Sequence, residues 1–177
     1  MHQPPDIPVH LTRRPRQGGL VVPWITPWVG GVYLFGTVTD LTRTQCLQGR
    51  RCQVCRRPLT GRAVLFARAS DLDHRCTVEP GTCPPCATYS ARACPMLAGR
   101  RHQHRAHEHP ALTGLPPASD EHLRRAAPAQ QWFAVWVRGY DVLPHPAQPG
   151  VLAASWRRIP PLTIRPLPHH TGPTPGS

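Results

Sequence analysis

Two pairs of cysteines have the spacing of metal ligands. The first pair is Cys52 and Cys55, the second is Cys83 and Cys86, and 27 residues separate the two pairs. With two residues between its members, each pair can direct both thiolates at one ion, and four thiolates complete a tetrahedron around Zn²⁺ at about 2.3 Å per bond. The pattern predicts a structural zinc site with these four cysteines as ligands.

The second pair has an alternative interpretation as a redox site. Two prolines separate Cys83 from Cys86, and such a motif at a helix start also occurs in thioredoxin-like proteins. That arrangement needs an apolar strand directly before the motif, whereas residues 78–82 read as a loop with Pro80 and Gly81. Zinc binding is therefore the favoured interpretation.

The other three cysteines fit the predicted tetrahedron less well. Cys94 follows Cys83 by eleven residues, which is about 16 Å along one helix and too far to share the ion. Cys46 could reach the metal only through a loop and is expected to be free. Cys76 is the one candidate substitute ligand, and a loop thiol near the site is its simpler interpretation.

Two groups of histidines could carry other chemistry. His74 follows Asp73 as in nucleases of the HNH type, where the histidine is a general base that activates water. Those enzymes carry Asn or His after the second cysteine pair, whereas Cys86 is followed by alanine and threonine. We therefore expect no catalytic residues and no enzyme. The histidines in residues 102–109 could chelate a metal, although the arginines among them favour a solvated linker.

The chain carries a large excess of positive charge. All 21 basic residues are arginine, only nine residues are acidic, and the formal net charge is +12. High-GC coding explains arginine in place of lysine but not the excess over acids, and such an excess favours nucleic acid, DNA or RNA, as a partner. A protein-binding adaptor and a merely solvated basic surface remain the alternatives. The candidate nucleic-acid contacts are Arg50, Arg51, Arg56, Arg57, Arg100 and Arg101.

Local patterns predict the elements that must position the cysteines. Apolar runs flanked by Gly or Pro predict strands over 20–22, 32–38, 63–67 and 132–137, with one or two more within 151–164. Prolines in the first turn and Pro95 beyond its end predict a helix over 84–93. The first cysteine pair is expected on a tight turn, or knuckle, that strands follow. The second pair then stands at the start of a helix. This order of elements predicts an α+β fold with a small treble-clef-like zinc centre flanked by strands.

Composition divides the chain into a core and Pro-rich segments. We expect a disordered tail over 1–19, strands and the zinc module over 20–98, and a His/Arg/Pro-rich linker over 99–130. Strands over 131–167 should pack on the same domain, followed by a tail over 168–177. No leader peptide or membrane-spanning stretch is recognisable, so we expect a cytoplasmic protein whose seven cysteines are metal ligands or free thiols.

Several short motifs together resemble a known group of proteins. They are Val22-Pro23-Trp24-Ile25-Thr26-Pro27-Trp28, Cys52-Gln53-Val54-Cys55, Glu79-Pro80, Cys83-Pro84-Pro85-Cys86-Ala87, Ala93-Cys94-Pro95-Met96-Leu97 and Trp136-Val137-Arg138-Gly139-Tyr140. The pattern, over roughly residues 20 to 143, is similar to a family of small uncharacterised proteins from high-GC bacteria and their phages. Members usually carry Gly after the first pair, where this chain has Arg56. The resemblance implies an accessory protein and no named reaction.

Overall fold

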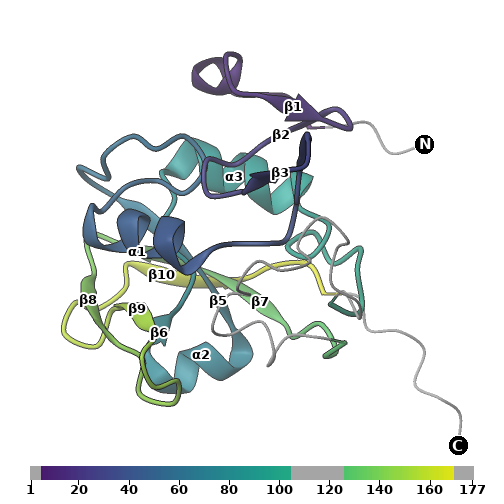
Figure 1. The fold of residues 1–177 in the computed structure, drawn as a ribbon. Helices are drawn as coiled ribbons and strands as arrows, with labels where there is room; N and C mark the ends of the chain where they lie inside the picture. Colours follow the sequence, from purple (N-terminus) through teal and green to yellow (C-terminus); the bar gives the residue numbers. More distant parts are fainter. Residues whose placement is uncertain (1–4, 105–125, 170–177) are drawn as a thin grey trace, which may run out of the picture.

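A mixed α+β architecture surrounds the buried strand β5 (Ala63–Arg68) in the computed structural model, which describes residues 5–104 and 126–169 (Figure 1). Strand β5 pairs antiparallel with β7 (Trp132–Val137), and β7 pairs antiparallel with β10 (Thr163–Pro166), so the sheet has the order β10-β7-β5. A second sheet has the order β6-β9-β8, formed by β6 (Cys76–Thr77), β9 (Leu152–Ser155) and β8 (Asp141–Pro144). The predicted α+β class is confirmed.

Both faces of β5 are covered, and all six of its residues are buried. Because side chains alternate across a strand, Val64 and Phe66 face one core, which includes Ala87 of helix α3 (Pro84–Ala93). Leu65 faces the opposite core with Val135, which is its cross-strand partner on β7. This double burial explains why β5 reads as a continuous apolar run, and it places α3 against the sheet.

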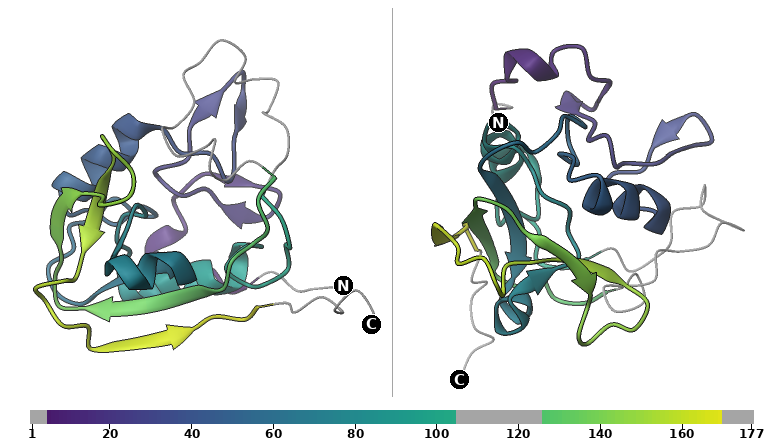
Figure 2. Two further views of the ribbon diagram at one scale, coloured as in Figure 1. Left: turned by 90° about the horizontal axis from the view of Figure 1, so that it is seen from below. Right: turned by 90° about the vertical axis from the view of Figure 1, so that its left-hand side faces the viewer.

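The opposite core joins the two sheets and helix α1 (Asp40–Gln48). Leu47 of α1, Tyr140, Ala154 and Trp156 pack there around Leu65. The side chain of Thr39 accepts a hydrogen bond from the Thr42 N–H and so caps the start of α1. Figure 2 shows α1 lying away from α3, and strand β5 lies between the cores that contain the two helices.

The N-terminal part of the chain forms short elements over the end of the molecule near α3. They are the 3₁₀ helix η1 (Val9–Leu11), the hairpin of β1 (Arg16–Gln17) with β2 (Leu20–Val21), and the hairpin of β3 (Trp28–Val29) with β4 (Val32–Tyr33). The Gln17 side chain joins the hairpins, because its amide donates to the Tyr33 carbonyl oxygen and accepts from the Tyr33 N–H.

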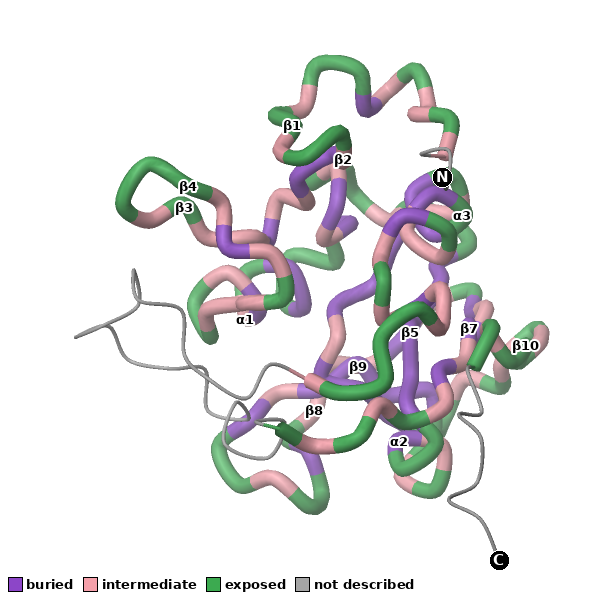
Figure 3. Tube along the Cα trace, turned by 90° about the vertical axis from the view of Figure 1, so that its right-hand side faces the viewer, coloured by how far each residue is buried: buried purple, intermediate pink, exposed green. Residues whose placement is uncertain are grey.

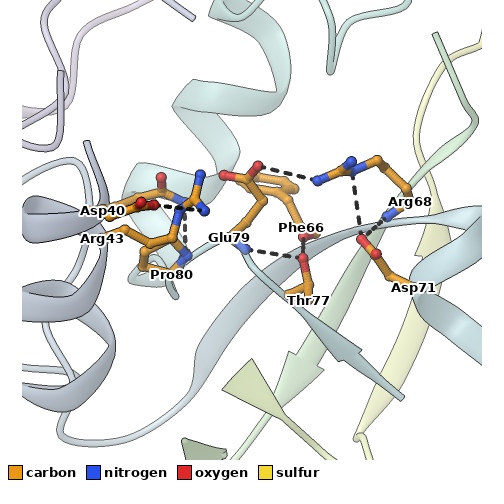
Figure 4. Close-up of polar contacts among 9 residues, drawn as sticks. Asp40, Arg43, Phe66, Arg68, Asp71, Thr77, Glu79 and Pro80 are labelled. Atoms are coloured by element: carbon orange, nitrogen blue, oxygen red, sulfur yellow. Dashed lines mark hydrogen bonds and ion pairs between the residues drawn. The ribbon is translucent and has the colours of Figure 1, made fainter. Parts of the chain in front are cut away.

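A buried ionic network holds the segment that leads into the second cysteine pair (Figure 4). The Arg68 guanidinium lies 3.8 Å from carboxylate oxygens of both Asp71 and Glu79, and the Arg68 N–H donates to Asp71 at 2.8 Å. The Thr77 hydroxyl donates to the Phe66 carbonyl and accepts from the Glu79 N–H. Burial raises the pKa of Asp71. These contacts tie helix α2 (Ala69–His74) and residues 76–79 to the end of β5.

The predicted elements agree with the structure where the local pattern is strong. The helix over 84–93 and the strand over 132–137 have the expected bounds, and the strand over 63–67 is one residue longer. The strand expected over 32–38 is limited to Val32–Tyr33, since the chain turns at Phe35 and Gly36. Helices α1 and α2 were not anticipated. Figure 3 shows residues 5–19 as part of the folded trace instead of the expected tail, and Leu11 is buried.

Replacing Leu65 with alanine should lower the free energy of unfolding by about 2 to 5 kcal/mol, because it leaves a cavity in a closely packed core. Urea unfolding of the folded protein measures the change. The matched control is Leu41→Ala on α1, where the side chain is 68% exposed and the effect should stay within about 0.5 kcal/mol. Equal losses at the two positions would contradict the placement of β5 in the core.

Candidate metal centre

Four side chains converge on one point between η1, the first cysteine pair and the start of α3. The sulfurs of Cys55, Cys83 and Cys86 and a ring nitrogen of His10 all lie within 4.8 Å of one another. Among the described residues, this is the group of Cys, His, Asp and Glu side chains that could hold an ion. Three of the four predicted thiols are therefore together, and His10 joins them.

The separations of these atoms fit tetrahedral zinc. Zn–S bonds of about 2.3 Å at tetrahedral angles place two sulfurs about 3.8 Å apart. The Cys55 and Cys83 sulfurs lie 3.8 Å apart. With a Zn–N bond of about 2.1 Å, nitrogen and sulfur should be about 3.6 Å apart, and His10 Nε2 lies 3.2 Å from the Cys86 sulfur. The other pairs of donor atoms lie within 4.8 Å of one another, and the Cys₃His donor set is one that structural zinc prefers.

Backbone hydrogen bonds shape the first cysteine pair into a tight knuckle. The Cys52 N–H donates to the Arg57 carbonyl, and the Arg56 N–H donates back to the Cys52 carbonyl at 2.8 Å. Arg56 has a φ of 65°, in the left-handed region that glycine adopts at least cost. Its guanidinium lies 4.6 Å from the centroid of the Trp24 ring, which is a favourable cation–π contact. The knuckle thus forms with arginine where glycine would have been easier.

The second cysteine pair is held beside strand β5. Val64 and Thr82 exchange two backbone hydrogen bonds of 2.9 Å, so Cys83 begins directly beside β5. The Gln53 N–H donates to the Gly81 carbonyl, which joins the knuckle to the same loop. Cys83 is the N-cap of α3, and Cys86 lies in the first turn of that helix. Both thiols therefore lie at the positive end of the helix dipole, which favours thiolates.

His10 reaches the cluster because η1 packs on the same small core as the cysteines. Leu11 and Val21 are buried there with Cys52, Cys86 and Tyr89. The Val21 N–H donates to the Tyr89 hydroxyl oxygen at 2.9 Å, which fixes β2 against α3. Sequence spacing gave no sign of this ligand, since His10 lies 76 residues from Cys86 in a segment expected to be a tail. The apolar residues that flank it, Val9 and Leu11, were the available signal.

Cys52 lies beside the cluster and is a second candidate for the fourth ligand position. Hydrogen bonds with the Cys52 and Cys86 thiols lower the pKa of Cys83 to about 4, and hydrogen bonds with Cys52 and Cys83 raise the pKa of Cys86. The Cys52 side chain is fully buried in the same core. Cys52 is outside the group of donor atoms that lie within 4.8 Å of one another, and its assignment as a ligand stays a prediction.

The remaining cysteines lie outside this group. Burial raises the pKa of Cys46 to about 12, and burial also raises the pKa of Cys76 and of Cys94. None of the three belongs to the group of described side chains that could hold an ion. Cys76 belongs to β6, and Cys94 is the C-cap of α3 at the end remote from Cys83.

The histidines considered for other chemistry also lie outside the cluster. His74 ends α2, and its ring makes an edge contact with His145 at 5.5 Å between centroids. His74 is thus the last residue of a short helix. Of the histidines in 102–109, His102 and His104 lie in the described part of the chain, and residues 105–109 lie outside it.

The six arginines predicted to contact nucleic acid have diverse surroundings. Arg50 and Arg56 lie over the rings of Tyr140 and Trp24. Arg100 donates to two carbonyl oxygens at the end of α3. All six are exposed, and no ring contact is described for Arg51, Arg57 and Arg101. Arg51 also donates to the Arg56 carbonyl at 3.4 Å.

No family model, no curated protein and no solved structure matches this chain. The resemblance drawn from its short motifs accordingly stays a prediction. In the described residues, no helix has the length and apolar character needed to cross a membrane.

Replacing Cys55, Cys83 or Cys86 with serine should abolish tight zinc binding, because these three sulfurs are common to the Cys₄ and the Cys₃His sets. Elemental analysis after dialysis should give about one zinc per chain for the wild type and for the controls Cys46→Ser and Cys94→Ser. Equal metal loss in all five variants would contradict the site.

Cobalt substitution distinguishes the two candidates for the fourth position. We expect Cys52→Ser to leave the thiolate-to-cobalt charge-transfer band unchanged, since His10 and three sulfurs already fit the tetrahedron. His10→Ala should retain the ion through Cys52 and strengthen that band. A weaker band in Cys52→Ser would instead assign Cys52 as the resident ligand.

Proposed function

We propose that this protein is a zinc-stabilised, non-enzymatic binding module whose partner is nucleic acid, held weakly and without sequence preference. The observation that carries the proposal is the convergence of His10, Cys55, Cys83 and Cys86 from three separate parts of the chain. A metal at this point would connect η1, the knuckle and α3, which is the role of a structural ion.

A structural role is favoured over a catalytic one by the number of donors. Catalytic zinc sites keep one coordination position for water or substrate, whereas structural sites are closed by four protein ligands. Here four donors converge, and Cys52 is buried in the same small core. Such a site leaves no position for a reacting water.

The nucleic-acid partner is supported by charge and by exposed aromatic surface. The formal net charge is +12, and exposed guanidinium groups lie on the first knuckle at Arg51 and Arg57. Trp28 in the hairpin of β3 and β4 is 60% exposed, and its ring lies 6.1 Å from that of Tyr33. Exposed aromatic rings and phosphate-binding arginines are the elements that hold single strands.

A protein-binding adaptor is the second candidate, and it has its own supporting observation. The side chains of Trp28, Val32 and Leu41 are exposed on the β3–β4 hairpin and the start of α1. Exposed large apolar side chains are surface that a protein partner could cover. Salt separates the candidates, since phosphate contacts weaken as salt rises and apolar contacts do not.

Binding to a short single-stranded oligonucleotide should have a micromolar or weaker dissociation constant at physiological salt. With a single strand each lost phosphate contact should reduce the log-log salt slope by about 0.7, so Arg51→Gln with Arg57→Gln should reduce it by about 1.4. Fluorescence anisotropy at several salt concentrations measures the slope.

The charge-matched control for this measurement is Arg75→Gln with Arg165→Gln, at exposed positions after α2 and on β10. It should leave the slope nearly unchanged. If the protein does not bind the oligonucleotide even at low salt, or if both double variants reduce the salt slope equally, the nucleic-acid function is wrong and the adaptor function is favoured.

The nuclease alternative predicts metal-dependent cleavage that depends on His74. We expect plasmid DNA to stay supercoiled with pure protein and Mg²⁺ or Mn²⁺, because His74 contacts the His145 ring and lies outside the ligand cluster. Agarose electrophoresis checks this. If the wild-type protein nicks the plasmid and the His74→Ala variant does not, the protein is a nuclease.

A further inference from the structure

An open cleft lies beside the metal cluster, between the N-terminal segment and the first knuckle. Its volume is about 610 Å³, and its lining residues are Val9, His10, Thr12, Arg13 and Arg57. Two of these five are arginines and none is acidic. The cleft shares His10 with the group of candidate metal ligands.

The charges around the cleft leave two guanidinium groups to attract an anion. Three thiolates and one Zn²⁺ carry a single net negative charge. Arg14 is half-buried, and its side chain donates two hydrogen bonds to the Val22 carbonyl oxygen. Arg13 and Arg57 are exposed and face the same cleft. Two like charges that face one space repel each other, and an anion between them removes that repulsion.

We propose that this cleft binds a phosphate group between Arg13 and Arg57, and that the bound metal ion fixes the distance between the two walls of the cleft. The second part of this inference rests on the proposed zinc centre. A guanidinium group presents parallel N–H donors that match two phosphate oxygens, which makes arginine the preferred residue for this anion. The phosphate is either a free ion or part of a nucleic-acid backbone.

The metal controls the cleft because its ligands belong to both walls. His10 precedes Arg13 by three residues on one wall, and Cys55 precedes Arg57 by two residues on the other. An ion that binds both His10 and Cys55 fixes the distance between the walls. The two arginines then meet the anion in one arrangement, so less conformational entropy is lost on binding.

The first experiment titrates inorganic phosphate into zinc-loaded and zinc-depleted protein and follows binding by calorimetry. We expect binding to the zinc-loaded form at least tenfold tighter than to the depleted form. Arg13→Ala and Arg57→Ala should each weaken it about tenfold or more, since a hydrogen bond to a charged group contributes about 1.5 to 3 kcal/mol. Arg75→Ala, at an exposed arginine after α2, is the control and should change nothing.

Two further variants keep the test decisive where an alanine substitution disturbs folding. Arg57→Lys keeps the charge but loses the paired donors, so its phosphate affinity should lie between those of wild type and Arg57→Ala. His10→Ala should keep zinc through Cys52 yet bind phosphate as weakly as the zinc-depleted protein. Wild-type phosphate affinity in His10→Ala, or in zinc-depleted protein, would overturn the assembly of the cleft by the metal.

Competition identifies the source of the phosphate. A single-stranded oligonucleotide that displaces inorganic phosphate, and that loses affinity in Arg13→Ala, supports the cleft as a backbone contact of the proposed nucleic-acid function. Phosphate binding without oligonucleotide binding supports a site for the free anion and removes the nucleic-acid function. Absence of phosphate binding to zinc-loaded protein, or equal affinity in Arg57→Ala and wild type, overturns the site itself.

Discussion

The two hydrogen bonds between Val64 and Thr82 connect the hydrophobic core to the candidate metal centre. Val64 lies on β5, all six residues of which are buried, and Thr82 directly precedes Cys83. The Thr82 hydroxyl also donates to the Val64 carbonyl, so no polar group of this residue is buried without a partner. The start of α3 is therefore held in place by the core, and so are the candidate ligands Cys83 and Cys86 at that start.

The candidate ligands on the other elements depend on this fixed point. The knuckle reaches it through Gln53, which donates to the Gly81 and Pro80 carbonyls, and η1 reaches it through the buried Leu11. An ion that joins segments so distant in sequence closes long loops, which restricts the unfolded chain more than the folded one. One metal would therefore stabilise the N-terminal hairpins as well as the knuckle.

The arginines divide between structural and solvent-facing roles. Arg68 is buried between two carboxylates, while Arg50 and Arg56 lie over aromatic rings. Such contacts use the flat guanidinium for packing within the fold. Of these three only Arg68 is buried, whereas Arg50 and Arg56 stay exposed beside their rings, and the proposals rest on Arg13 and Arg57, which are exposed as well.

The sequence by itself determined what depends on neighbours along the chain. The helix over 84–93, with its prolines in the first turn, and the apolar strand over 132–137 have the predicted bounds because local sterics and periodicity decide them. The helix α2 was missed because it spans six residues and depends on the contact of Asp71 with Arg68. His10 was missed for the same kind of reason. Only packing of Leu11 and Val21 against α3 brings its ring to the sulfurs, and no spacing in the chain encodes a contact made across 76 residues.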